Sequence, residues 1–153
     1  LLTAPLYEEP FIILLPAAHP LSRRKTIKSE QLADESMLLL GAGHCFRDQV
    51  LEYCPECLSR PTQEKDHAAR VEGSSLETIR HMVASGMGIT VLPCTSAGSD
   101  RYSQRLMSIS RFSKPEPKRI VALAWRISFP RPKVIDVLRE AVNACQLSCV
   151  KML

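Results

Sequence analysis

Short apolar runs alternate with helical segments along this 153-residue chain, and this alternation restricts the fold more than any other feature. The continuous apolar run Phe11–Leu15 predicts a strand that is buried on both faces, and Ile89–Pro93 predicts another short buried strand. Between them, apolar residues recur at helical spacing over 76–83, after a capping-box pattern that begins at Ser74. Strands that alternate with helices predict an α/β fold with a parallel or mixed sheet.

The other expected elements are short. We expect further strands at Met37–Leu40, Ala69–Glu72, around Leu106–Ile109 and at Ile120–Trp125, and helices at Ser29–Ala33, from Cys45 to about Leu58 and from about Lys133 to Gln146. The proline-rich segment Lys114–Pro117 is the best candidate for a crossing between two lobes, and such crossings act as hinges in two-lobed binding proteins.

Composition and charge narrow the function classes. The hydrophobic fraction of 45% and the charged fraction of 24% are those of a soluble globular protein. No apolar run approaches the roughly 20 residues that span a bilayer, and the first twenty residues are no signal peptide, so we expect a cytoplasmic protein. The net charge of +4, with no basic run longer than Arg23–Lys25, argues against direct nucleic-acid binding by this chain. Residues 23–28 are expected to form a solvated loop, and His67 and His81 are expected at the surface.

A glycine turn at Gly41–Gly43 follows an expected strand and precedes the helix that opens near Cys45. This arrangement is the one in which α/β folds place ligands. The free amides and the dipole of a helix N-terminus also favour a thiolate. His44 can donate to the thiolate or to a peroxide, and Arg47 adds positive charge if it turns inward. Asp48 can accept from the Cys45 amide, as in a capping box, or hold a water or peroxide.

Cys54 follows Cys45 by nine residues on the same expected helix. Nine helical residues rotate by about 180° net and rise about 13 Å, whereas a disulfide needs Cα atoms roughly 4.4–6.8 Å apart. The two thiols therefore cannot join unless the helix unwinds, which would couple oxidation to refolding. A thiolate that attacks a peroxide becomes a sulfenic acid, with which Cys54 could condense. Leu51 and Tyr53 are expected on a buried face that refolding would expose.

The remaining cysteines allow other interpretations. In a reducing cytosol, the six cysteines must be inert, metal-bound or reactive. Cys94, Cys145 and Cys149 are expected to be small hydrophobic residues of the core. The C-x-x-C pair at Cys54–Cys57 could instead act as a dithiol or bind zinc, with Cys145 and Cys149 as further ligands if the terminal helix folded back. We favour a chain without a metal site or cofactor.

Taken together, these residues resemble the OxyR family, the peroxide sensors among the LysR-type transcription regulators. The resemblance covers nearly the whole chain, through the segments Gly41–Gln49 with Cys54, Val71–Arg80, Met82–Pro93, Lys114–Arg119 and Val121–Arg126. The segment Met82–Pro93, with its glycines and its closing leucine-proline, marks the LysR-type superfamily. The His-Cys motif with a second cysteine nine residues later is specific to the peroxide sensors.

The resemblance implies a role for each residue of the motif. Cys45 matches the cysteine that reacts with hydrogen peroxide, and Cys54 matches the one that forms a disulfide with it. His44 and Asp48 match residues that surround the peroxide. Arg119 matches an arginine that supports the thiolate.

The resemblance also implies the architecture and the partners. The fold would be a periplasmic-binding-protein-like pair of α/β lobes, here one complete lobe plus part of the other. Residues 1–10 would end a first-lobe segment, 11–118 would form the second lobe with the redox switch, and 119–153 would return to the first lobe.

Family members are cytoplasmic homotetramers that bind promoter DNA through an N-terminal winged helix-turn-helix, and oxidation rearranges the tetramer to recruit RNA polymerase. We expect this sequence to lack that domain and the first half of the first lobe, and its incomplete first lobe to expose apolar surface. The expected partners are hydrogen peroxide, further copies of the chain and a thiol reductant such as glutaredoxin.

Two other functions stay open on the sequence. A LysR-type effector domain without a redox role would bind a small anionic metabolite through Ser74, Ser75 and the helix N-terminus near Cys45. A thiol peroxidase would need turnover, and the chain shows no separate reductant site, so we expect no enzyme. Cys57 lies outside the family's pattern and is a second candidate for the resolving thiol.

Overall fold

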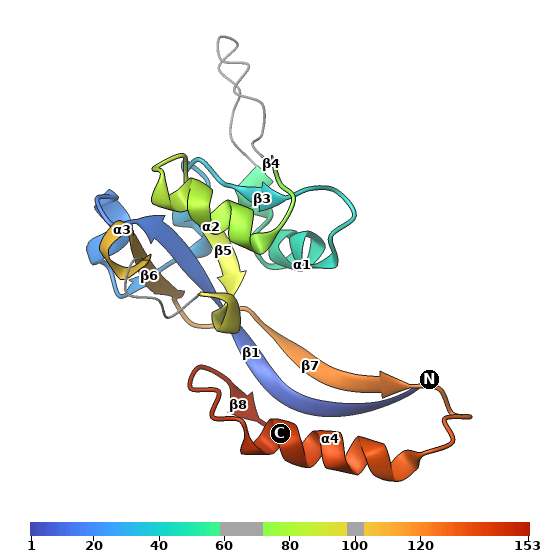
Figure 1. Cartoon of the computed structure of the whole chain (residues 1–153). Coiled ribbons are helices and arrows are strands. Elements are labelled where there is room, and N and C mark those ends of the chain that lie inside the picture. The colour runs from blue at the N-terminus through green and yellow to red at the C-terminus, as the bar shows by residue number, and fades with distance from the viewer. Residues whose placement is uncertain (59–71, 98–102) are drawn as a thin grey trace. The chain divides into compact units, whose positions relative to one another are not determined.

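The computed structural model of the chain describes residues 1–58, 72–97 and 103–153. The chain divides into two compact units, a smaller one of Leu1–Pro10 with Lys118–Leu153 and a larger one of Phe11–Pro117. The long strand β1, Leu2–Pro16, supplies its first part to the smaller unit and its last part to the larger one (Figure 1). The division at Pro117 coincides with the end of the proline-rich segment.

The larger unit is built on a mixed sheet in the order β2–β6–β1–β5, in which β2 spans Thr26–Ile27, β5 spans Thr90–Pro93 and β6 spans Met107–Phe112. Strand β1 pairs antiparallel with both β5 and β6, whereas β2 pairs parallel with β6. The apolar run of β1 from Phe11 to Leu15 is buried throughout, as expected of a strand that is covered on both faces. The predicted mixed sheet and the predicted buried strand are confirmed.

A second, parallel pair of strands carries the two main helices of this unit. Strand β3, Leu39–Leu40, pairs with β4, Glu72–Gly73. The helices α1, Cys45–Tyr53, and α2, Leu76–Ala84, lie beside this pair (Figure 1). The strand predicted at Met37–Leu40 is shorter than expected, with Met37 forming only an isolated bridge to Ile89. Of the strand predicted at Ala69–Glu72 only Glu72 is described, and His67 also lies outside the described residues.

Several short helices complete the larger unit. The 3-10 helices are η1 Pro20–Arg23, η2 Ser29–Leu32, η3 Pro55–Leu58 and η4 Cys94–Ser96, and the helix α3 spans Ser103–Leu106. The helix predicted at Ser29–Ala33 is thus a 3-10 turn, and its N-cap is Lys28. The basic stretch 23–28 is exposed apart from Ile27, which is fully buried. Among the described residues, no helix has the length and apolarity that crossing a membrane requires.

Helix α2 begins one residue later than the capping-box pattern predicts. Its N-cap is Ser75, whose Oγ accepts a hydrogen bond from the Thr78 amide at 3.1 Å. The prediction that Ser74 caps the helix is therefore wrong, because the adjacent serine satisfies the free amide of the first turn. Ile79 and Val83, predicted on the apolar face, are buried.

Replacing the true cap should destabilise the chain more than replacing its neighbour. We expect Ser75→Ala to lower the free energy of unfolding by about 1 kcal/mol, because an amide of the first turn loses its acceptor. The matched control, Ser74→Ala, should change it by less than about 0.5 kcal/mol. Urea unfolding followed by circular dichroism measures both. A larger effect at Ser74 would show that the cap is assigned to the wrong serine.

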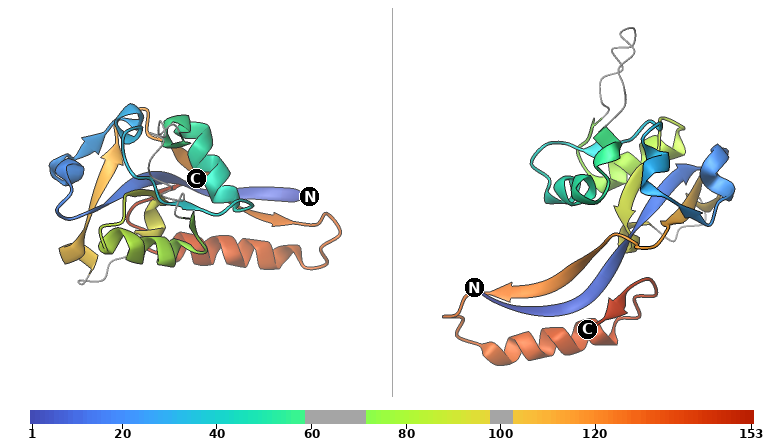
Figure 2. Two further views of the ribbon diagram at one scale, coloured as in Figure 1. Left: turned by 90° about the horizontal axis from the view of Figure 1, so that it is seen from above. Right: turned by 180° about the vertical axis from the view of Figure 1, so that it is seen from behind.

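The smaller unit is an antiparallel sheet with one long helix. The first part of β1 pairs with β7, Lys118–Trp125, and with the short β8, Lys151–Met152 (Figure 2). Helix α4, Pro132–Ala144, begins with a proline in its first turn, where the missing amide hydrogen is no loss. The strand predicted at Ile120–Trp125 and the helix predicted near Lys133–Gln146 are confirmed to within two residues.

Helix α4 leaves apolar side chains in contact with solvent. None of its residues is buried, and Val134, Val137 and Leu138 are 41%, 62% and 44% exposed. These three positions follow the i, i+3, i+4 spacing of one helix face. The expectation that the smaller unit exposes apolar surface is confirmed for this helix.

The smaller unit buries one carboxylate completely. Glu9 on β1 is 0% exposed, and its Oε2 accepts from Nε of Arg119, its cross-strand partner on β7, at 2.7 Å. A buried charge is tolerated when a partner compensates it, which explains why Arg119 lies directly opposite. The adjacent Glu8 accepts from Lys118 Nζ at 2.8 Å, and this contact holds the pKa of Glu8 below its ordinary value.

The two neighbouring cations of β7 should differ sharply in their contribution to stability. We expect Arg119→Ala to lower the free energy of unfolding by about 3 kcal/mol, because it removes the partner of a buried carboxylate. Lys118→Ala, the matched control, removes an ion pair whose lysine is 53% exposed and should cost less than about 1 kcal/mol. Guanidinium unfolding of both variants tests this, and equal losses would contradict the burial argument.

Candidate functional site

Cys45 is the first residue of α1, as predicted, and its side chain is exposed. The preceding turn depends on Gly43, whose φ of +94° lies in the region that favours glycine. His44 is the N-cap, with φ −83° and ψ 116°, and it is also exposed. An accessible thiol therefore stands where the free amides of the first helical turn point outward.

Arg47 fixes the first turn of α1 to the small parallel sheet. Its Nη1 donates to the Leu40 carbonyl at 2.7 Å and to Oε1 of Glu72 at 2.7 Å. The arginine side chain is only 13% exposed. The Arg47 guanidinium thus binds groups at the ends of β3 and β4. It is not turned toward Cys45, which the sequence had left possible.

Asp48 does not cap the helix. Within the described part of the chain, no hydrogen bond joins its carboxylate to the Cys45 amide. The side chain is exposed in the first turn, where a negative charge stabilises a helix. The predicted capping bond is absent here, and the predicted role of Asp48 beside a peroxide stays a prediction.

The buried face of α1 is not the one expected. Phe46 and Val50 are 7% and 2% exposed, and the Phe46 ring meets Phe11 edge to face with centroids 5.2 Å apart. Leu51 is half-buried and Tyr53 is 50% exposed, so the prediction that these two form the buried face is wrong. The i, i+4 spacing from Phe46 through Val50 places Cys54 next on this face.

Helix α1 ends at Tyr53, five residues before the predicted end. A residue that precedes proline is displaced from the helical region, and Cys54 accordingly has φ −139° and ψ 67° before Pro55. The chain continues as the 3-10 turn η3, in which the Cys57 amide donates to the Cys54 carbonyl at 3.0 Å. Since side chains three apart are eclipsed in this geometry, the two cysteines point the same way.

Cys54 and Cys57 form a buried pair of free thiols, 1% and 8% exposed. The Cys57 thiol donates to Cys54 Sγ, with 2.7 Å between the sulfur atoms, and the Cys54 thiol faces the Ser29 carbonyl at 3.9 Å. The hydrogen bond from Cys57 lowers the pKa of Cys54. The same bond, followed by burial and by the charges of Cys54 and Glu56, raises the pKa of Cys57.

An ordered α1 keeps Cys45 and Cys54 apart. The helix has nine residues, and Cys54 follows its last one. At the helical rise, these two positions are separated by about 13 Å along the axis, beyond the roughly 4.4–6.8 Å between disulfide-linked Cα atoms. A disulfide between them therefore requires α1 to unwind.

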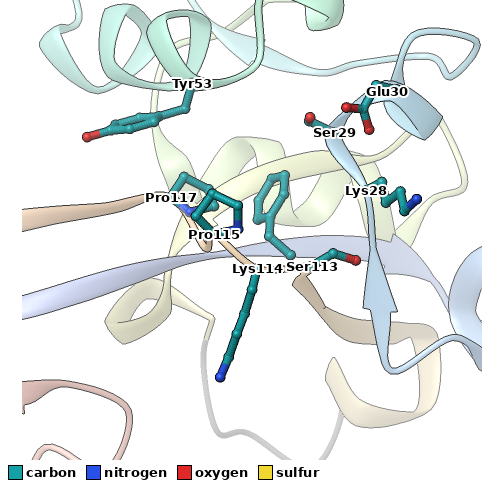
Figure 3. A pocket seen from close by; sticks show the side chains of 9 residues that line it. Lys28, Ser29, Glu30, Tyr53, Ser113, Lys114, Pro115 and Pro117 are labelled. Atoms are coloured by element: carbon teal, nitrogen blue, oxygen red, sulfur yellow. The ribbon is translucent and has the colours of Figure 1, made fainter.

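A cavity of about 430 Å³ lies beside the C-terminal end of α1 (Figure 3). Tyr53 lines it from α1, and Ser29 and Glu30 line it from η2. The remaining lining residues are Lys28, Phe112, Ser113, Lys114, Pro115 and Pro117. Sequence reasoning missed this cavity because its walls come from three separate segments of the chain, at 28–30, 53 and 112–117. Neither Ser74 nor Ser75 lines it, and the Ser75 hydroxyl is already engaged as a cap.

Other predicted residues have varied outcomes. Cys94 is buried as predicted, whereas Cys145 is exposed and Cys149 half-buried, so the core assignment is wrong for Cys145, which lies just past the exposed helix α4. Arg119 lies in the smaller unit with Glu9, and its role toward a thiolate stays a prediction.

His81 is 78% exposed. Among residues 1–58, 72–97 and 103–153, no three His, Cys, Asp or Glu side chains are grouped as a metal site.

The anchoring of α1 can be tested by separating the two acceptors of Arg47. We expect Arg47→Ala to lower the free energy of unfolding by about 1–3 kcal/mol, since it leaves the Leu40 carbonyl without its donor. Glu72→Ala should cost less than about 1 kcal/mol, because Glu72 is 41% exposed and Arg47 keeps its other bond. Amide hydrogen exchange should accelerate across α1 only in Arg47→Ala. Equal exchange in both variants would contradict this anchoring.

Comparisons with known proteins agree with the fold. A family model described as the LysR substrate binding domain matches residues 1–146. The chain is 34% identical over 140 residues to the transcriptional dual regulator OxyR of Escherichia coli K12, covering 92% of this chain and 44% of that protein. It is 35% identical to the hydrogen peroxide-inducible genes activator of Pectobacterium carotovorum, covering 89% of this chain and 44% of the relative. The chain thus spans less than half the length of these relatives.

Solved structures give the same result. The reduced OxyR regulatory domain of Pseudomonas aeruginosa matches with a TM-score of 0.79 and 52% identity, over 94% of this chain and 66% of that one. A reduced OxyR of Neisseria meningitidis matches with a TM-score of 0.85 and 39% identity, over 99% of this chain and 69% of that one. These matches confirm the resemblance to OxyR and the α/β fold class. The chain belongs to the LysR substrate binding domain family.

Proposed function

We propose that this chain is the redox-sensing regulatory domain of a LysR-type transcription activator that responds to hydrogen peroxide. One observation carries the proposal: an exposed free thiol, Cys45, opens α1, and a buried free thiol, Cys54, follows its last residue. Relatives named as hydrogen peroxide-inducible genes activators, and OxyR structures in reduced and oxidised forms, support it.

The chemistry takes two steps. The Cys45 thiolate attacks one oxygen of hydrogen peroxide, the O–O bond breaks, and the second oxygen leaves as hydroxide, leaving Cys45 as a sulfenic acid. We assign to His44, the exposed N-cap, the role of hydrogen-bond donor to the departing oxygen. The Cys54 sulfur then attacks Cys45, and water leaves with the Cys54 proton to give the disulfide. Peroxide is reduced to water, and a thiol reductant of the glutaredoxin class restores both thiols.

Disulfide formation would change the surface of the larger unit. Unwinding α1 breaks the hydrogen bonds of Arg47 and exposes Phe46 and Val50. Newly exposed apolar surface is favourable to bury against another subunit. This burial would rearrange a homodimer or homotetramer of the whole protein. In this proposal the whole protein is a cytoplasmic regulator rather than an enzyme. It binds promoter DNA through a separate N-terminal domain and recruits RNA polymerase.

The test is the fate of each thiol after exposure to peroxide. One equivalent of hydrogen peroxide should remove two thiols from the reduced chain, and mass spectrometry should locate the first disulfide formed at Cys45–Cys54. Dithiothreitol should restore both thiols. Cys45→Ser should abolish the loss, because it removes the attacking sulfur. Cys145→Ser is the matched control, since Cys145 is also an exposed free thiol, and it should react like the wild type.

Each competing function gives a different result. Loss of the Cys54 thiol in Cys45→Ser at the wild-type rate would refute the proposal. Sustained peroxide consumption with a thiol donor would indicate a thiol peroxidase. Thermal stabilisation by a carboxylate, without any thiol oxidation, would indicate the anion-binding effector domain.

A further inference from the structure

We propose that Cys57 is an internal exchange thiol, which attacks Cys54 in the Cys45–Cys54 disulfide and transfers the disulfide to Cys54–Cys57. The inference rests on the proposed function, because that first disulfide is the substrate of the exchange. It assigns a role to a cysteine that the His-Cys motif does not include.

Position favours Cys57 as the attacking thiol. Its sulfur lies 2.7 Å from Cys54 Sγ, and both side chains are buried together in the η3 turn. Three residues of a 3-10 turn rise about 6 Å with eclipsed side chains, which is within the Cα spacing of a disulfide. The Cys54–Cys57 disulfide can therefore form without rearranging the backbone of this turn.

The two disulfides differ in what they require of α1. The Cys45–Cys54 disulfide keeps α1 unwound, so that Phe46 and Val50 lose their burial and Arg47 loses its acceptors. A Cys54–Cys57 disulfide lies wholly beyond Tyr53, where α1 ends. Exchange thus allows α1 to refold, and the recovered burial and hydrogen bonding drive the disulfide toward Cys57.

The exchange is balanced within the chain. The Cys57 thiolate attacks Cys54 Sγ, the bond between Cys54 and Cys45 breaks, and Cys45 leaves as a thiolate, with no net oxidation. Glu56 is the candidate acceptor of the Cys57 proton, because its charge acts on Cys57 and its buried Oε2 has no hydrogen-bond partner among the described residues. The released Cys45 thiolate takes a proton from water or reacts with another peroxide.

The same contacts hold Cys57 inactive until Cys54 is oxidised. In the reduced chain, the hydrogen bond to Cys54 is the largest cause of the raised pKa of Cys57. Once Cys54 belongs to a disulfide, the contact between the two free thiols no longer exists, and the largest cause of the raised pKa of Cys57 is removed. Attack by Cys57 thus follows oxidation of Cys54 and does not precede it.

The experiment follows both disulfides over time. Reduced wild type and Cys57→Ser receive one equivalent of hydrogen peroxide, catalase then destroys the excess, and acid-quenched samples are alkylated and mapped by mass spectrometry. In wild type, Cys45–Cys54 should decline while Cys54–Cys57 rises in parallel and Cys45 becomes alkylatable again. In Cys57→Ser, Cys45–Cys54 should persist at least about tenfold longer. Cys57→Ala repeats the test without burying a hydroxyl, and Cys145→Ser should match wild type.

The outcomes separate the two proposals. If Cys45–Cys54 forms and persists equally in wild type and both Cys57 variants, the exchange is overturned and the peroxide-sensing proposal stands. If Cys45→Ser forms Cys54–Cys57 as fast as wild type does, that disulfide arises without Cys45, and both the exchange and the peroxide-sensing proposal are overturned. If Cys45–Cys54 forms in no variant that retains both cysteines, the peroxide-sensing proposal fails, and the exchange fails with it.

Discussion

The hydrogen bonds of Arg47 anchor the first turn of α1, and the environments of the cysteines follow from the position of this helix. By binding the Leu40 carbonyl and Glu72, Arg47 joins the first turn of α1 to the ends of β3 and β4. The helix then presents Cys45 to solvent and directs Phe46 toward Phe11 in the core. Nine residues later the same helix delivers Cys54 into the interior, so that one short element produces two thiols of opposite accessibility.

Sequence patterns predicted the elements whose formation depends on residues close together in the chain. The apolar run at Phe11–Leu15, the glycine turn before Cys45 and the periodic face of α2 each identified an element in the right place. Pro55 also carried a usable signal, because a residue before proline leaves the helical region. The prediction that α1 continues to Leu58 did not take this signal into account. It therefore missed the 3-10 turn that joins Cys54 to Cys57.

Contacts between distant segments were beyond the reach of such patterns. Arg47 meets Glu72 across 25 residues, and Glu9 meets Arg119 across 110. No periodicity encodes these pairings, because they depend on which strands become neighbours. The same limit applies to the cavity beside Tyr53, which η2 and the end of β6 complete. The exposed position of Cys145 likewise depends on a helix, α4, whose apolar side chains remain uncovered.

Tyr53 gives α1 an internal optical reporter. Its ring packs edge to face against Phe11, with centroids 5.9 Å apart and planes at 84°, although half of the residue is exposed. An asymmetric aromatic environment of this kind produces a near-ultraviolet dichroic signal that vanishes when the ring rotates freely. Because Tyr53 is the last residue of α1, its contribution to the near-ultraviolet spectrum depends on whether the helix is wound.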